Sequence, residues 1–297
     1  MWSRVYSPTW DTFVGHRKEV ETLLNSKRAA EKRGEPLRPV LLWGPSGCGK
    51  TTLARLLGGK NMIEVSGATL EGFSLAKLIF KTRKGGGTIL IDEIHALKSQ
   101  EQELLYPLLD RGEFWWGGRV IETKVSLIGT TTKMAKLNIP LKNRFSITVY
   151  LGTYPVDDLA KILHNAAREM GMKCTEEAVQ LIADLSRGVP RNALSLLNMA
   201  RDTSDVVDQE AARKAAAALG YDEYGLTYSE RVYIISLYSL GSSASLSVMS
   251  TILQQDSSST KAIEGYLLKK GFVSISSRGR ELTLEGMEYA EQVLSEK

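Results

Sequence analysis

The sequence predicts an α/β domain with a parallel sheet and helices on both faces, followed by a small all-helical domain and a third unit of three helices and a β-hairpin. Two continuous apolar runs, Pro39–Trp43 and Thr88–Ile91, carry the first prediction. Short runs of this kind are typical of strands that are buried on both faces of a parallel sheet. Each run is followed by a polar segment and a helical pattern, and this alternation implies parallel strands joined by helices.

The polar segment after the first strand, residues 44–52, reads Gly-Pro-Ser-Gly-Cys-Gly-Lys-Thr-Thr. This is the G-x-x-x-x-G-K-[ST] phosphate loop in the strand–loop–helix context that it requires. Glycines let backbone N–H groups turn inward around a polyphosphate, and the N-terminus of the helix adds its positive dipole end. Lys50 would reach the β- and γ-phosphates of ATP, and the Thr51 hydroxyl would bind Mg²⁺. The residues predicted to bind nucleotide here are Gly47, Gly49, Lys50, Thr51 and Thr52.

Two acids, Asp92 and Glu93, follow the second apolar run. Carboxylates at the carboxyl end of a parallel strand lie at the edge where α/β proteins bind ligands. Asp92 is predicted to hold the Mg²⁺, directly or through water, and Glu93 to orient and activate the attacking water. The structural alternative is an N-cap role for Asp92 on the next helix. With the phosphate loop upstream, the acidic pair predicts an ATPase.

Composition is typical of a soluble globular protein, since 43% of the 297 residues are hydrophobic and 24% are charged. The sequence shows neither an apolar run long enough for a membrane span nor a secretory signal. Two cysteines, Cys48 and Cys174, do not form a disulfide framework, and a reducing cytoplasm suits them. Residues 1–150 hold 23 Lys and Arg against 14 Asp and Glu, so the excess positive charge lies with the nucleotide module, where phosphates or nucleic acid would be met.

The rest of the chain predicts three domains. Further strands are expected at Met62–Val65 and Val125–Thr132, and a β-hairpin with a Gly-Gly turn at Phe114–Ile121. The pattern becomes entirely helical from Val156, and after Ser229 three helices precede two short strands, which describes a winged helix. The predicted domains are residues 1–154, 155–224 and 225–297.

Taken in order, these pieces resemble the AAA+ ATPases and, among them, the RuvB family, the motor of Holliday-junction branch migration. Many ATPases share the phosphate loop and the acidic pair, whereas Leu-Tyr-Pro at 105–107, Gly-Val-Pro-Arg at 188–191 and the terminal winged helix narrow the resemblance to RuvB. Other matching stretches are FVGH at 13–16, IDEIH at 91–95, LIGTTT at 127–132, PLKNRF at 140–145 and SRGR at 277–280. The resemblance implies a large AAA+ domain, a small helical lid and a winged-helix DNA-binding domain.

The resemblance also implies roles for single residues. Thr131 would be the sensor that touches the γ-phosphate, with Thr132 as the neighbouring candidate. Arg144 would be the arginine finger that enters the next subunit's site, and Arg191 the second sensor on the lid. The residues that would surround the adenine are Val14, Gly15 and Tyr154. A site completed by a neighbour makes hydrolysis depend on assembly, so the resemblance implies a hexameric ring with ATP and Mg²⁺ as cofactors.

Two further pairs are predicted to contact partners. Arg278 and Arg280 would present two guanidiniums at the wing tip, where they would contact DNA phosphates; the alternative is a winged helix that binds protein only. Trp115 and Trp116 are successive strand residues, so they point to opposite faces and at least one indole is expected to be exposed. In the family this hairpin docks RuvA, which implies a RuvA-like partner.

Departures from the family pattern indicate a divergent member. Lys133 and Lys142 stand where the family has Arg, and the stretch between Asp110 and Val125 is shorter than the family's hairpin. Two functions stay open on the sequence. The leading one is an ATP-driven DNA translocase that acts on branched DNA; the alternative is an AAA+ loader or remodeller of a protein partner, in which ATP switches binding.

Overall fold

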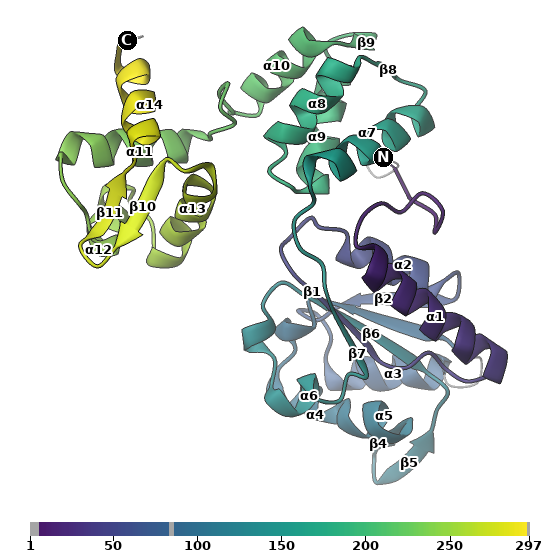
Figure 1. Ribbon diagram of the computed structural model, residues 1–297. Helices are drawn as coiled ribbons and strands as arrows, with labels where there is room; N and C mark the ends of the chain where they lie inside the picture. Colours follow the sequence, from purple (N-terminus) through teal and green to yellow (C-terminus); the bar gives the residue numbers. More distant parts are fainter. Residues whose placement is uncertain (1–5, 83–85, 296–297) are drawn as a thin grey trace. The chain divides into compact units, whose positions relative to one another are not determined.

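A computed structural model describes residues 6–82 and 86–295. The chain divides into two compact units, residues 1–212 and 213–297, which meet within helix α10 (Gln209–Ala218). Figure 1 labels the helices and strands of both units. Within the described ranges, every helix is too short or too polar to cross a bilayer.

The first unit is built on a five-stranded parallel sheet in the order β2-β3-β6-β1-β7. Its strands are β1 (Val40–Trp43), β2 (Met62–Ser66), β3 (Thr88–Asp92), β6 (Ser126–Thr131) and β7 (Ile147–Tyr150). Strand β1 pairs with β6, and β6 pairs in turn with β3, so the carboxyl ends of these three parallel strands follow one another along the same edge of the sheet. The phosphate loop and the acidic pair therefore lie at one edge of the sheet.

Helices cover both faces of this sheet, as the alternation of apolar side chains requires. Leu42 and Leu90 pack with α1 (Arg17–Arg33) and α2 (Lys50–Gly58) on one face. Leu41 and Ile91, their neighbours in the strands, pack on the other face. That second face carries α3 (Gly72–Thr82), α4 (Ser99–Leu104) and α5 (Tyr106–Arg111). The predicted α/β class is confirmed.

Shorter elements complete the sheet domain. Strands β4 (Glu113–Trp116) and β5 (Arg119–Glu122) form the expected antiparallel hairpin, with Gly117 and Gly118 in its turn at φ of 57° and 72°. Both values lie in the left-handed region, which glycine adopts without strain. Two 3₁₀ turns link neighbouring elements: Ile94–Ala96 lies between β3 and α4, and Met134–Lys136 lies between β6 and helix α6 (Ile139–Lys142).

The rest of the first unit is the predicted helical lid. It contains α7 (Val156–Glu169), α8 (Glu176–Leu185), α9 (Pro190–Arg201) and a two-residue strand pair, β8 (Lys173–Cys174) with β9 (Val206–Val207). Pro190 begins α9 at a position where its missing N–H costs nothing. The start of α9 matters for the site because it carries Arg191.

The second unit has the winged-helix order of elements and ends on a helix that the sequence pattern did not predict. The elements are α11 (Tyr228–Leu240), α12 (Leu246–Ile252), α13 (Ser257–Lys270), β10 (Val273–Ser276), β11 (Gly279–Leu282) and α14 (Leu284–Ser295). Tyr289 on α14 is buried in the core of this unit, and its hydroxyl donates to the Asp222 carboxylate at 2.6 Å. The domain boundaries at 154/155 and 224/225 stay predictions.

Candidate functional site

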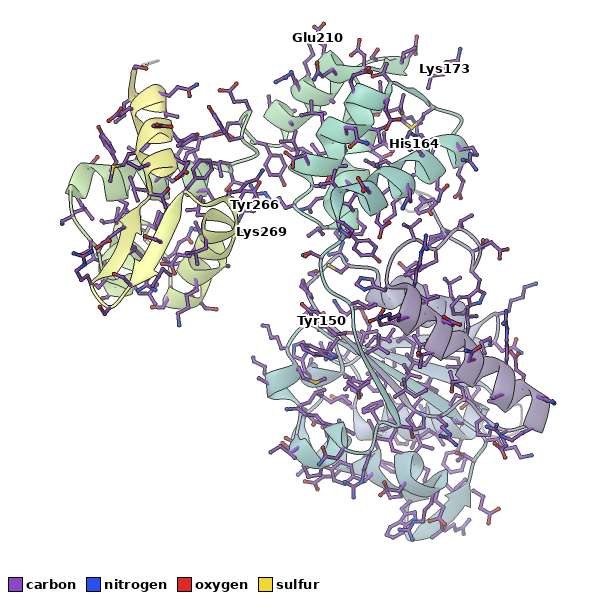
Figure 2. All side chains as sticks on the ribbon, in the orientation of Figure 1. Tyr150, His164, Lys173, Glu210, Tyr266 and Lys269 are labelled. Carbon is purple, nitrogen blue, oxygen red and sulfur yellow. The ribbon has the colours of Figure 1, made fainter. Side chains whose placement is uncertain are left out.

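A cleft of about 610 Å³ lies between the phosphate loop and the lid, within the first unit. Its lining includes five residues that are predicted to bind nucleotide: Val14, Gly47, Gly49, Thr52 and Tyr154. Gly15, also predicted there, does not line the cleft but lies close to the ring of Tyr154. Figure 2 shows Tyr150 at the end of β7, and its ring packs 4.4 Å from that of Trp43, at the carboxyl edge of the sheet.

Lys50 lies at the bottom of the phosphate loop with only 6% of its surface exposed. Its ammonium donates hydrogen bonds to the carbonyl oxygens of Gly44 (3.0 Å) and Pro45 (2.7 Å). Burial lowers the pKa of Lys50, while the nearby Glu93 and Asp92 carboxylates oppose the shift. The loop therefore holds a desolvated cation that is hydrogen-bonded to two neutral carbonyls. An anionic phosphate can replace these carbonyls as the partner of the ammonium.

The metal site predicted at Thr51 and Asp92 is a close pair of oxygen donors. The Thr51 hydroxyl donates to a carboxylate oxygen of Asp92 at 3.0 Å, and Thr130 donates to the same oxygen. Hydroxyl and carboxylate oxygens are the ligands that Mg²⁺ takes in nucleotide sites, usually two from the protein beside phosphate and water. The residues present fit the ion. Asp92 ends β3 rather than capping a helix, since residue 93 is the cap of the following 3₁₀ turn.

Glu93 has a left-handed backbone (φ 51°), which is strained for a residue other than glycine. Its carboxylate accepts hydrogen bonds from the backbone N–H and the hydroxyl of Thr132, both at 3.0 Å, and lies 2.9 Å from Nδ1 of His95. Three groups thus fix the direction of this carboxylate at the edge of the cleft. Sequence reasoning did not assign His95, although it stands within the quoted IDEIH stretch.

The threonines at the end of β6 have different hydrogen-bond partners, and the sensor role of Thr131 stays a prediction. Thr131 is fully buried, and its hydroxyl is hydrogen-bonded to Nδ1 of His95 at 2.9 Å. Side chains alternate at the end of β6, so Thr130 and Thr132 face the acidic pair, where Thr130 contacts Asp92 and Thr132 contacts Glu93. Thr132, the neighbouring candidate, is the threonine that contacts Glu93.

The predicted adenine end is built around Tyr154, which is 6% exposed. Its ring packs edge-on against His16 at 4.8 Å, and its hydroxyl donates to the Cys48 carbonyl at 3.4 Å. A methyl group added at Gly15 would lie 2.5 Å from this ring, so only glycine allows the close approach. Burial raises the pKa of the Tyr154 phenol, which stays neutral.

The lid contacts the phosphate loop directly through Arg191. Its guanidinium donates to the Ser46 hydroxyl at 3.0 Å, and its backbone N–H donates to the Gly47 carbonyl at 3.3 Å. A methyl group at Gly47 would lie 2.7 Å from Val189, so the lid and the loop are in close contact at this point beside the cleft. Arg191 therefore borders the place where terminal phosphates would lie.

Arg144 lies outside this cleft. Its Nε donates to Asp110 at 2.8 Å, its Nη1 donates to the Pro140 carbonyl at 2.8 Å, and its guanidinium stacks 4.4 Å from the ring centre of Tyr106. Asp92, Glu93 and Arg191 line the cleft of the same chain, but Arg144 does not.

In the second unit, the structure separates the two wing arginines. The side chain of Arg278 is 77% exposed and has only a loose contact with Glu281 at 3.4 Å. Arg280 instead forms two hydrogen bonds, at 2.9 and 3.2 Å, with the buried carboxylate of Glu264, which also accepts from the Tyr233 hydroxyl. The expectation of two free guanidiniums is therefore wrong for Arg280, because its stem turns back onto α13.

The hairpin tryptophans point to opposite faces, as predicted. Trp115 is 49% exposed, and its indole N–H donates to Glu113 at 3.1 Å. Trp116 stacks on the buried Phe114, with ring centres 6.1 Å apart, and packs against the core. The expectation of at least one exposed indole is confirmed for Trp115.

Comparison with protein families gives three matches in chain order. Residues 6–151 match the Holliday junction DNA helicase RuvB P-loop domain, residues 154–226 the RuvB AAA lid domain, and residues 223–291 the RuvB C-terminal winged helix domain.

Whole-chain comparisons agree with these matches. The Holliday junction branch migration complex subunit RuvB of Neorickettsia sennetsu is 33% identical, covering 96% of this chain and 92% of its own length. The protein of the same name from Nitratiruptor is 34% identical, with coverages of 94% and 89%. Among solved structures, the Thermotoga maritima RuvB Holliday junction branch migration motor is 30% identical, with a TM-score of 0.80 over 96% of this chain and 98% of that one.

Proposed function

The chain belongs to the RuvB family, and we propose that it is an ATP-driven motor that moves the branch point of Holliday junctions. The observation that carries the proposal is the cleft, where Lys50, the acidic pair and Arg191 converge on one edge of the sheet. The same chain adds a winged helix, so one polypeptide holds both the ATPase site and a DNA-binding unit.

The cleft supports a defined division of labour in hydrolysis. Thr51 and Asp92 would hold Mg²⁺, which neutralises charge on the β- and γ-phosphates. Lys50 would exchange its two carbonyl partners for phosphate oxygens, and Glu93 would accept a proton from the attacking water. Tyr154 and Val14 would enclose the adenine, and Arg191 would report the state of the γ-phosphate to the lid.

The cleft of one chain has no contribution from its own Arg144. We infer that a neighbouring subunit supplies this arginine and that the working form is a hexameric ring in the cytoplasm. A ring also suits a motor that must stay on DNA through many cycles of hydrolysis. A RuvA-like junction-binding protein is the expected recruiting partner.

Arg278 is the proposed phosphate contact of the wing, and Arg280 is its structural neighbour. Arg278→Ala should weaken DNA binding by a similar factor for all sequences and lower the salt slope by about one unit. Arg280→Ala should instead leave the buried Glu264 carboxylate without its cationic partner and cost the winged-helix unit about 3 kcal/mol of stability. Salt-dependent binding and thermal unfolding of both variants separate the roles. An unchanged affinity and slope for Arg278→Ala would make the winged helix a protein-binding module.

Trp115 is the proposed docking residue of the hairpin. Exposed tryptophans are enriched at binding hot spots, where truncation costs about 2 kcal/mol or more. Trp115→Ala should keep the basal ATPase rate and oligomer mass and lose the stimulation given by the recruiting partner. Val206→Ala is the matched control, because Val206 is also an exposed apolar strand residue but lies on β9 of the lid and not in the hairpin. A collapse of basal ATPase or assembly in Trp115→Ala would show that this side chain is structural.

A motor and a loader differ in how hydrolysis responds to DNA. We expect four-way DNA to raise the steady-state ATPase rate of the purified protein more than duplex DNA of equal length does. A rate that responds only to a protein partner would favour the loader.

A further inference from the structure

Arg144 is held by three groups from two short helices. Asp110 and Tyr106 lie one turn apart on α5, so they occupy the same face of that helix. The Asp110 carboxylate accepts a hydrogen bond from Nε, and the Pro140 carbonyl of α6 accepts one from Nη1. The Tyr106 ring covers one face of the guanidinium. Figure 1 shows α5 and α6 near each other beneath the sheet.

Both helices are fixed to the core. Leu108 and Leu109 of α5 are buried, and Leu141 of α6 is fully buried. Groups on such elements are placed more accurately than groups on loops. Arg144 lies two residues after the end of α6, so its backbone shares this support.

The arrangement leaves a defined edge of the guanidinium open. Among the hydrogen bonds within residues 6–82 and 86–295, the bonds of Arg144 use Nε and Nη1 and none uses Nη2. The side chain is 30% exposed. The contacts therefore fix the guanidinium plane and leave Nη2 available to an acceptor on another molecule.

We propose that Asp110 and Tyr106 are positioning residues that hold Arg144 ready to meet the γ-phosphate in a neighbouring subunit. The inference rests on the proposed trans role of Arg144. Arginine has many rotamers, and a guanidinium that is already oriented loses less entropy when it binds. An exposed ion pair adds little to folding stability, so Asp110 is free to serve orientation instead.

The test uses mixed rings in which only one kind of site can hydrolyse ATP. The acceptor subunit carries Arg144→Ala and keeps its own cleft. The donor carries Lys50→Ala, which disables its own cleft and keeps its finger. Activity of the mixture then measures the donor's finger alone.

Three donors are compared in the Lys50→Ala background, with added Asp110→Ala, Asp110→Asn or Glu35→Gln. Glu35 is the matched control because it also forms an exposed ion pair with an arginine, Arg33 at the end of α1, at 2.6 Å. The Asp110→Ala donor should restore about 10- to 100-fold less kcat than Lys50→Ala alone, because small displacements of a catalytic group have costs of this size. KM for ATP should stay unchanged. The Asp110→Asn donor keeps an acceptor for Nε and should recover part of the loss.

Tyr106 gives a second comparison. A Tyr106→Phe donor keeps the stacking ring and should restore activity fully, whereas Tyr106→Leu should not. Thermal unfolding and native mass must match the Lys50→Ala donor for each variant. Equal or higher activity from the Asp110→Ala donor would overturn the proposal. If the Lys50→Ala donor itself restores nothing although mixed oligomers form, the trans finger fails and this inference fails with it.

Discussion

Arg144→Ala protein should bind ATP normally and hydrolyse it about 10³- to 10⁵-fold more slowly, which is the range that an arginine finger contributes. The reason is geometric. The cleft of each chain already contains Lys50, Glu93 and Arg191, so ATP binding needs nothing from Arg144. In the Arg144→Ala protein, the charge that develops on the γ-phosphoryl group in the transition state is stabilised by one cation fewer.

Single-turnover hydrolysis and titration with a fluorescent ATP analogue measure the two quantities separately. Arg33→Ala is the matched control, because Arg33 also forms an exposed ion pair with a carboxylate but lies at the end of α1. Retention of more than a tenth of the wild-type rate in Arg144→Ala would show that this arginine is a surface ion pair and no finger.

Glu93→Gln should bind ATP and Mg²⁺ and lose about 10²- to 10⁴-fold in kcat, because the amide has the shape of the carboxylate but cannot accept the proton of water. Lys50→Ala should instead lose ATP binding, since Lys50 is the buried cation of the phosphate loop. The pair of variants separates chemistry from affinity.

Isothermal titration with a slowly hydrolysed ATP analogue gives the affinity, and phosphate release gives the rate. Thr132 and His95 can still bond to a glutamine at position 93, so the variant should keep its stability. Wild-type turnover by Glu93→Gln would remove this residue from the mechanism and reopen the assignment of the acidic pair.

The features that sequence predicted best are local ones. The phosphate loop is a continuous segment whose glycines, lysine and threonine act within one turn, so their spacing alone carries the chemistry. The two apolar runs predicted β1 and β3 because strands buried on both faces need apolar residues throughout. The hairpin turn was readable in the same way from Gly117 and Gly118.

The features that sequence could not predict depend on contacts between distant residues. Which hydroxyls of residues 130–132 face Asp92 and Glu93 depends on which side of the sheet each β6 side chain lies. Strand β6 is buried throughout, so no alternation of polar and apolar residues in the sequence marks its two faces. Arg280 differs from Arg278 because of Glu264, which is 16 residues away on α13. The contact of Arg144 with Asp110 joins residues 34 positions apart. Helix α14 is a different case, because Tyr289, Ala290 and Val293, which pack in the core of the second unit, have helical spacing and offered a local signal.

The most direct test of the proposed function follows the branch point itself. A four-way junction with homologous arms and fluorophores on two strands is incubated with the purified protein, with and without the recruiting partner. ATP should drive separation into two duplexes, the Lys50→Ala protein should not, and a non-hydrolysable analogue should support binding without movement. Junctions that stay intact with ATP, protein and partner, while the same preparation hydrolyses ATP, would contradict a branch-migration motor.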